Sequence, residues 1–402
     1  MSEVENLTPA MQQFYEIKKE YNDSILFFRM GDFYEMFGPD AEIAHSVLGI
    51  AITSRNKNAA NPEKLAGFPY HARDKYLPKL LEAGYKVAIA EQVSDPKAKG
   101  IVKREVVRVV TPATLDLESE ILEGKNFSNN SIVSIFEEKG KYGFSIIDLS
   151  TNAWKVGEFS DFNSLSKELY KVSPKEVILE KSLFGNTQIE NILTKKYSLN
   201  IYFFSAKNEA KTYLQNHFKT KNLEGFGIEN KALATKAGAM LLEYIESNQK
   251  TSLGFLRDLS FDSFSGVLDL DESTIRNLDL IYNFATRSSK NGTLFGVMDE
   301  TNTSAGARLL RQNILNPLKD EKGIETRYDI IEEFLANPIL LSKVEDKLKG
   351  VSDIDAILNR VVLERVNPRE LLNLKRSLVS ILEAFDLIKS DGSEKLKKLL
   401  NL

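Results

Sequence analysis

The sequence predicts a multidomain α+β protein built from three parts. The chain has 402 residues, which is enough for two to four domains with several hydrophobic cores. Strand and helix patterns alternate through residues 1–115 and 127–225, whereas residues 231–402 show helical periodicity almost throughout. We therefore expect two mixed α/β domains followed by an all-α domain.

Composition limits the chemistry that this chain can perform. It is 42% hydrophobic and 27% charged, and no apolar stretch is long enough to span a bilayer. The first residues have neither the charged start nor the apolar core of a signal peptide, which predicts a cytoplasmic protein without a membrane partner. The absence of cysteine excludes disulfides and cysteine nucleophiles, and the three histidines are too scattered to suggest a zinc site.

Charge is distributed unevenly over the first part. The net charge of the whole chain is −4, which argues against a globally basic nucleic-acid binder. Residues 1–50 hold 3 basic and 9 acidic side chains, whereas residues 51–110 hold 12 basic and 6 acidic ones. A local basic surface attracts phosphates even on an acidic protein, although a solvated charged face is the commoner meaning of such a cluster.

The first part opens with a helix and a hairpin. Thr8 can cap a helix whose first position is Pro9, and Gly31-Asp32 separates two apolar runs, which is typical of a turn between strands. The remaining pattern predicts a helix over Pro39–Leu48 stopped by Gly49, a strand over Ile50–Thr53, a helix ending at Gly84, and strands over Lys86–Ala90 and Glu105–Val110.

The second strand of this hairpin carries an unusual pair of side chains. If it is extended, Phe33, Glu35 and Phe37 share one face, with Tyr34 and Met36 on the other. An aromatic ring two residues from a carboxylate is costly to bury, because an unpaired buried charge is unfavourable. From the residues alone, Phe33 is most simply a core side chain, since large aromatic rings are usually buried.

The second part shows a β-β-β-α-β order. Strands are predicted over Ser131–Phe136, Tyr142–Asp148, Ala153–Phe159 and Glu176–Glu180, with a helix over Leu165–Tyr170. The third part begins with a predicted helix over Ala232–Ser247. It ends in a long amphipathic pattern whose apolar positions recur every three or four residues, as in packed helices.

The chain resembles the MutS family of DNA mismatch-repair proteins from Leu7 to about Leu387. The hairpin Phe27–Phe37 resembles the mismatch-reading motif of that family. Further segments match in the expected order, namely Leu65–Ala72, Val87–Gln92, Val106–Pro112, Leu268–Asp279, Leu294–Pro317 and Asp353–Val361.

The resemblance implies three domains and four DNA-binding residues. It assigns residues 1–115 to a mismatch-recognition domain, 127–225 to a ribonuclease H-like connector, and 231–402 to part of a helical lever. Phe33 would be the wedge inserted at a mismatch, and Glu35 would bond the wedged base, donating to a purine N7 only when protonated. Arg55 and Arg108 would contact phosphates. The implied partner is double-stranded DNA with mismatches or small loops.

The family's ATPase motif is missing from this sequence. No Gly-x-x-x-x-Gly-Lys-[Ser/Thr] occurs, so we expect the chain not to be an enzyme by itself and to hold no cofactor. The resemblance places ATP and magnesium in a C-terminal domain that this chain lacks. It also implies a homodimer that recruits a MutL-type partner, and we expect apolar surface to stay exposed near Leu402.

Two other functions fit parts of the sequence. The connector could be a divergent metal-dependent nuclease, but that chemistry needs several converging carboxylates, and Asp148 is the one plausible ligand. Alternatively, the chain could be a scaffold that binds repair partners without recognising DNA itself.

Overall fold

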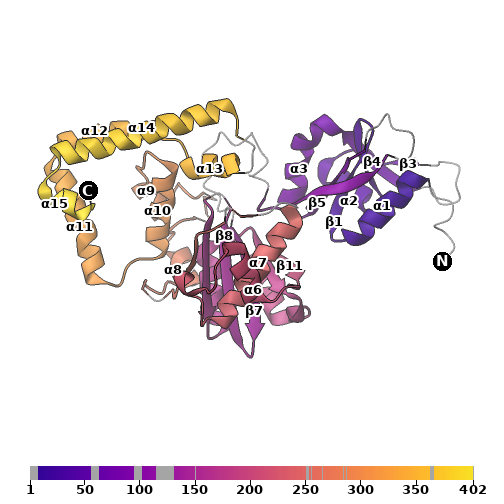
Figure 1. The fold of residues 1–402 in the computed structure, drawn as a ribbon, viewed down its shortest axis with the longest axis horizontal. Coiled ribbons are helices and arrows are strands. Elements are labelled where there is room, and N and C mark those ends of the chain that lie inside the picture. The colour runs from indigo at the N-terminus through magenta and orange to yellow at the C-terminus, as the bar shows by residue number, and fades with distance from the viewer. Residues whose placement is uncertain are drawn as a thin grey trace.

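The computed structural model describes residues 8–55, 63–94, 102–114, 131–149, 151–249, 253–254, 256–264, 266–283, 285–286, 288–362 and 366–401. Three units follow one another along the chain. They lie in a row in Figure 1, with the indigo α1 toward one end and the yellow α15 toward the other.

The first unit is a mixed sheet between two helical layers. Its strands lie in the order β3-β4-β2-β1-β5-β6, in which β1 and β5 are parallel and the other neighbouring pairs are antiparallel. The elements are α1 (Pro9–Glu20), β1 (Ser24–Met30), β2 (Phe33–Phe37), α2 (Pro39–Leu48), β3 (Thr53–Arg55), β4 (Glu63–Pro69), α3 (Arg73–Glu82), β5 (Lys86–Gln92) and β6 (Arg104–Val110).

Apolar side chains cover both faces of this sheet. α1 packs Met11 and Phe14 against Phe28 and Phe37 on one face, while α2 and α3 cover Tyr34 and the rest of the other face. The sequence predicted α2 with its stop at Gly49, which adopts a left-handed conformation with φ of 70°. The third strand begins at Thr53, later than the predicted Ile50, because the segment before it is not paired in the sheet.

The second unit is another mixed sheet, with strand order β11-β10-β7-β8-β9-β12. α6 and α7 pack on one face, and α4 and α5 pack on the other. The β-β-β-α-β order predicted from the sequence is present. The elements are β7 (Ser131–Glu138), β8 (Lys141–Asp148), β9 (Ala153–Phe159), α4 (Phe162–Val172), β10 (Glu176–Glu180), α5 (Thr187–Asn191), β11 (Asn200–Phe204), α6 (Ala210–Phe218), α7 (Ala232–Gln249) and β12 (Leu259–Phe261).

The structure corrects the expected boundary at residue 231. The helix α7 was expected to open the helical third part, but it is buried against the sheet of the second unit, where it packs on Trp154 and Val156. β12 then pairs in parallel with β9 at the edge of the same sheet. A helix with apolar and small residues all around its circumference needs burial on several sides, and the sheet supplies it. The second unit therefore extends through β12.

Within the described residues, the regular elements of the third unit are helices, and α12 packs along α14 through Leu340, Val344, Ala384 and Ile388. Figure 1 shows these two helices side by side. Large apolar side chains remain exposed here, including Ile339 at 71% and Leu382 at 63%, in agreement with the expected apolar surface. The elements are α8 (Glu272–Asn277), α9 (Leu294–Met298), α10 (Ser304–Leu315), α11 (Glu321–Ala336), α12 (Pro338–Leu348), α13 (Ile354–Val362), α14 (Pro368–Asp391) and α15 (Glu394–Leu399).

None of the helices within the described ranges combines the length and apolar character that a membrane span requires.

Candidate nucleic-acid interface

The hairpin between β1 and β2 presents Phe33 at the end of the first sheet. Gly31 turns the chain with φ of 59°, and Phe33 then pairs opposite Met30 in β1 and Pro69 in β4. The Phe33 residue is 45% exposed, whereas Tyr34 is 2% exposed on the opposite face. The alternation predicted from the sequence is confirmed, and Phe33 is an exposed ring on a rigid support.

Glu35 lies two residues farther along the same face and is half-buried. Its strand neighbours are Phe28 in β1 and Gly67 in β4. A Cβ atom at position 67 would lie 2.9 Å from the carbonyl oxygen of Tyr34 and 3.6 Å from Cγ of Glu35. Gly67 therefore keeps open the space that the Glu35 side chain occupies.

A cation near Glu35 was missed by the sequence analysis. The Arg104 guanidinium lies 5.1 Å from the centre of the Phe28 ring, and its Nε donates to the carbonyl oxygen of Arg29 at 2.6 Å. Burial lowers the pKa of Arg104, and the negative charge of Glu35 acts in the opposite direction. Membership of the basic stretch 51–110 was the only sequence signal for Arg104.

The opposite face of the hairpin is braced by a second polar cluster. The Arg29 guanidinium lies 3.6 Å from the centre of the Tyr70 ring and 3.6 Å from the Glu91 carboxylate, which also accepts a hydrogen bond from the Tyr34 hydroxyl. The Tyr70 amide donates to the carbonyl oxygen of Asp32 at 2.9 Å. The stacked guanidinium and these hydrogen bonds restrict the turn, so they hold Phe33 in position from the opposite face of the sheet.

The two arginines predicted to contact phosphates have different surroundings. Arg55 ends β3 opposite Glu63 in β4, and its side chain lies outside the described part of the structure. Arg108 lies in the edge strand β6 opposite Ile89 of β5, yet it is only 8% exposed. This burial argues against a direct phosphate contact by Arg108, because a guanidinium that binds a phosphate must reach the surface.

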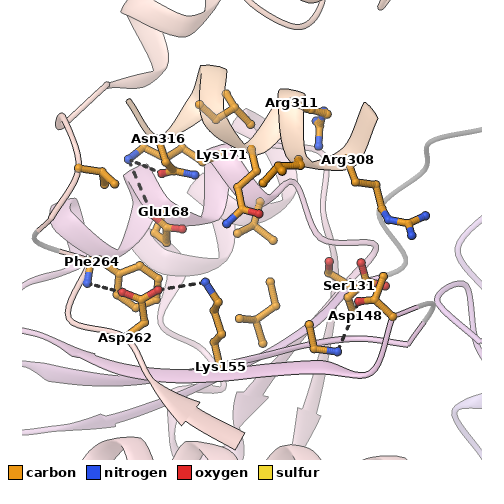
Figure 2. Close-up of a pocket in the computed structure, with 18 of the residues that line it drawn as sticks. Ser131, Asp148, Lys155, Glu168, Lys171, Asp262, Phe264, Arg308, Arg311 and Asn316 are labelled. Atoms are coloured by element: carbon orange, nitrogen blue, oxygen red, sulfur yellow. Dashed lines mark hydrogen bonds and ion pairs between the residues drawn. The ribbon is translucent and has the colours of Figure 1, made fainter. Parts of the chain in front are cut away.

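A separate cavity of about 550 Å³ lies between the second sheet, α4 and α10. Figure 2 shows Asp148 beside Ser131, across this cavity from Glu168 and Asp262. Lys155 pairs with Asp262 at 3.2 Å, and Lys171 lies 3.8 Å from Glu168. The acidic groups of this cavity are thus dispersed and partly neutralised.

This arrangement bears on the nuclease hypothesis. Two-metal hydrolysis requires several carboxylates directed at a common point. Within the described ranges, no group of three His, Cys, Asp or Glu side chains is placed to hold a metal ion. The cavity therefore does not favour a catalytic connector built on Asp148.

Three family models match this chain in succession. They are MutS domain I over residues 8–119, MutS domain II over 130–257 and MutS domain III over 273–401. Together they cover most of the chain. The match to domain II includes α7, in agreement with the packing of that helix on the second sheet.

Curated relatives match along almost the whole chain. A protein from Halothermothrix orenii named DNA mismatch repair protein MutS is 41% identical over 382 residues, covering 93% of this chain and 42% of the relative. Proteins with the same name from Methanococcoides burtonii and Streptococcus sanguinis are 40% and 38% identical, covering 93% and 99% of this chain. The chain spans less than half the length of these relatives, 42–45%. The chain therefore belongs to the MutS family and carries, in order, regions that match the family's domains I, II and III.

Proposed function

We propose that this chain recognises mismatched or looped double-stranded DNA as the reading part of a MutS-type mismatch-repair sensor. The observation that carries this proposal is the exposed Phe33 ring at the end of a braced sheet, with Glu35 on the same face. Phe33 enters the minor groove, separates two stacked base pairs and kinks the duplex.

Discrimination comes from the deformability of the DNA. Inserting a ring between base pairs costs unstacking and bending energy, and that cost is lower where pairing and stacking are already weak. A mismatch or an unpaired nucleotide supplies such a point. A sensor of this type accepts many different mismatches because it does not depend on one pattern of base edges.

Glu35 adds a polar check to the wedge. In this proposal, its carboxyl group bonds the edge of the displaced base beside an inserted Phe33, donating to a purine N7 when it carries a proton. Against a correctly paired duplex, an ionised carboxylate approaches phosphates and repels them. Arg104 lies near enough to influence Glu35 electrostatically, and Arg55 remains a proposed phosphate contact.

The names of the relatives support this role, since each is called a DNA mismatch repair protein. For the longer proteins of the family we propose a homodimer that recruits a MutL-type partner, with ATP and magnesium held outside the three regions matched here. Neither the nuclease nor the scaffold alternative has an observation of comparable specificity in its favour.

A duplex-binding titration tests the proposal. A fluorescent duplex carrying one G·T mismatch or one unpaired T is compared with its matched counterpart at fixed salt, because phosphate contacts make affinity strongly salt-dependent. The proposal predicts tighter binding to the mismatched duplex. Equal binding to all three duplexes would show that this chain does not recognise mismatches by itself.

A further inference from the structure

The first and second units meet at a buried polar joint. Its groups lie at the starts of β1 and β5 and just after the end of β6 in the first unit, and in β10, β11 and α7 in the second. The residues that carry this interdomain joint are Gly84, Lys86, Ala113, Glu176, Tyr202 and Tyr244.

Glu176 is the centre of the joint. It begins β10 and is fully buried, yet one carboxyl oxygen accepts from the backbone amide of Ala113 at 2.6 Å. The other oxygen accepts from the hydroxyl of Tyr244 in α7 at 3.1 Å. Ala113 belongs to the turn that follows β6. A side chain of the second unit is therefore hydrogen-bonded directly to the segment where the chain leaves the first unit.

A buried ammonium group crosses the joint from the other side. Lys86 begins β5 and is 5% exposed, and its Nζ pairs with Asp23 of its own unit at 2.9 Å. The same Nζ lies 4.1 Å from the centre of the Tyr202 ring and 5.2 Å from that of Tyr244. Two rings of the second unit thus cover the cation, an arrangement that is attractive when water is excluded.

The chain segment before β5 touches the second unit at close range. The carbonyl oxygen of Gly84 accepts from the Tyr202 hydroxyl at 3.0 Å. A Cβ atom on Gly84 would lie 2.8 Å from Oδ1 of Asn200. The φ of Gly84 is 86°, a backbone conformation that residues with a side chain rarely adopt. Both the conformation and the approach therefore favour glycine here.

We infer that this interdomain joint sets the orientation of the reading hairpin, with Glu176 and Lys86 as positioning residues. β1 has seven residues, and its first residue, Ser24, pairs with Lys86 while its last precedes the turn to Phe33. At about 3.3 Å per residue, the joint lies about 20 Å from the hairpin. A tilt of about 10° at the joint would move Phe33 by about 3.5 Å, the rise of one base pair.

The polar character of the joint is what makes it directional. Apolar side chains of similar volume would hold two domains together as well or better, because burying charged groups is costly. Hydrogen bonds and ion pairs instead have preferred angles, and breaking one leaves a buried group without its partner. Burial raises the pKa of Glu176, although the hydrogen bonds from Thr111 and Ala113 and the charge of Lys86 act to lower it. Burial therefore favours the neutral form of this carboxyl group.

The test measures the orientation of the two units without DNA. Because the chain has no cysteine, Ser46→Cys in α2 and Gln188→Cys in α5 give one spin-label pair across the joint. Double electron–electron resonance on this pair should give one narrow distance distribution. Glu176→Leu and Lys86→Met should each at least double its width. Glu168→Gln, which changes a carboxyl group of similar burial in the same unit but facing α10, should leave the width unchanged.

Each outcome decides the inference. A distribution that stays narrow in the folded Glu176→Leu and Lys86→Met proteins would overturn it, as would a broad distribution in the parent. If Glu176→Leu does not fold, Lys86→Met decides alone, because methionine preserves the length and packing of the stem. The consequence for recognition rests on the proposed function. With Phe33 intact, Lys86→Met should lose most of the preference for mismatched DNA. A parent without that preference refutes the function and leaves the distance result standing.

Discussion

Replacing Phe33 with alanine tests the wedge directly. The ring is 45% exposed, so its removal exposes little new apolar surface and should cost about 1 kcal/mol of stability. Stacking of an aromatic side chain on a base contributes about 1–3 kcal/mol to binding. Phe33→Ala should therefore weaken binding to a duplex with one unpaired T by about 5-fold to 150-fold, and it should leave binding to the matched duplex nearly unchanged.

The assay is fluorescence anisotropy with both duplexes at one salt concentration. Phe184→Ala is a matched control, because Phe184 is 73% exposed in the second unit, away from the hairpin. The control should bind both duplexes like the parent. Thermal unfolding of each variant separates a loss of recognition from a loss of fold.

One result would refute the reasoning. If Phe33→Ala is folded and still prefers the unpaired-T duplex by the same factor as the parent, the ring does not read the mismatch. A parallel loss of affinity for both duplexes would instead assign Phe33 to general DNA binding, which also contradicts the wedge.

Three further predictions concern the support of the site. Glu35→Gln should retain mismatch binding but bind matched DNA about fivefold more tightly, since removing a charge near phosphates relieves about 1 kcal/mol of repulsion; unchanged discrimination in the same titration contradicts it. Gly67→Ala should lower the free energy of unfolding in urea by about 1–3 kcal/mol, because the added Cβ meets the carbonyl oxygen of Tyr34. Gly225 has open space around it, so the unfolding free energy of Gly225→Ala should stay close to that of the parent, apart from the small difference in conformational propensity between glycine and alanine. Burial raises the pKa of Glu176 above its usual 4.5, so the folded chain holds a proton that the unfolded chain releases. The stability from this group is complete below pH 4.5 and falls as pH rises toward the folded pKa. Glu176→Gln should therefore gain melting temperature relative to the parent as the pH rises above about 4.5, and parallel pH profiles would contradict the assignment.

Local patterns predicted the hairpin because its determinants are local. A Gly-Asp turn and a period of two along Phe33–Phe37 are sufficient to place Tyr34 inward and Phe33 outward once the strand forms. The same holds for α2, whose end at Gly49 depends on one left-handed residue. These features could be predicted from the sequence without knowing what packs against them.

Arg108 and Arg104 show where local patterns fail. The pairing of β6 with β5 shifts register between Ile89 and Ala90, and the last three residues of β6 are all buried. The alternation of side chains along β6 therefore does not reveal that Arg108 is buried. Arg104 becomes part of the site through a bond to Arg29, 75 positions away in the chain. The helix α7 was assigned to the third part for a similar reason. Its sequence pattern predicts that the helix is buried, but it does not indicate which unit buries it.

The hairpin and the interdomain joint are mechanically related, because they lie at opposite ends of β1. If Phe33 is inserted into a duplex, unstacking one base-pair step costs a few kcal/mol, and this energy is the load that the joint must bear. A joint weaker than this would tilt before the DNA kinked. The contacts that cross the joint are the Ala113–Glu176 and Tyr202–Gly84 hydrogen bonds, at about 1 kcal/mol each and more where a charge takes part, and the Lys86 ammonium against the Tyr202 ring, at about 0.5–2 kcal/mol. Their sum is of the same order as the load. If Phe33 acts as the proposed wedge, we therefore expect the joint to hold while a weakened base-pair step opens, and to tilt instead against a well-stacked step.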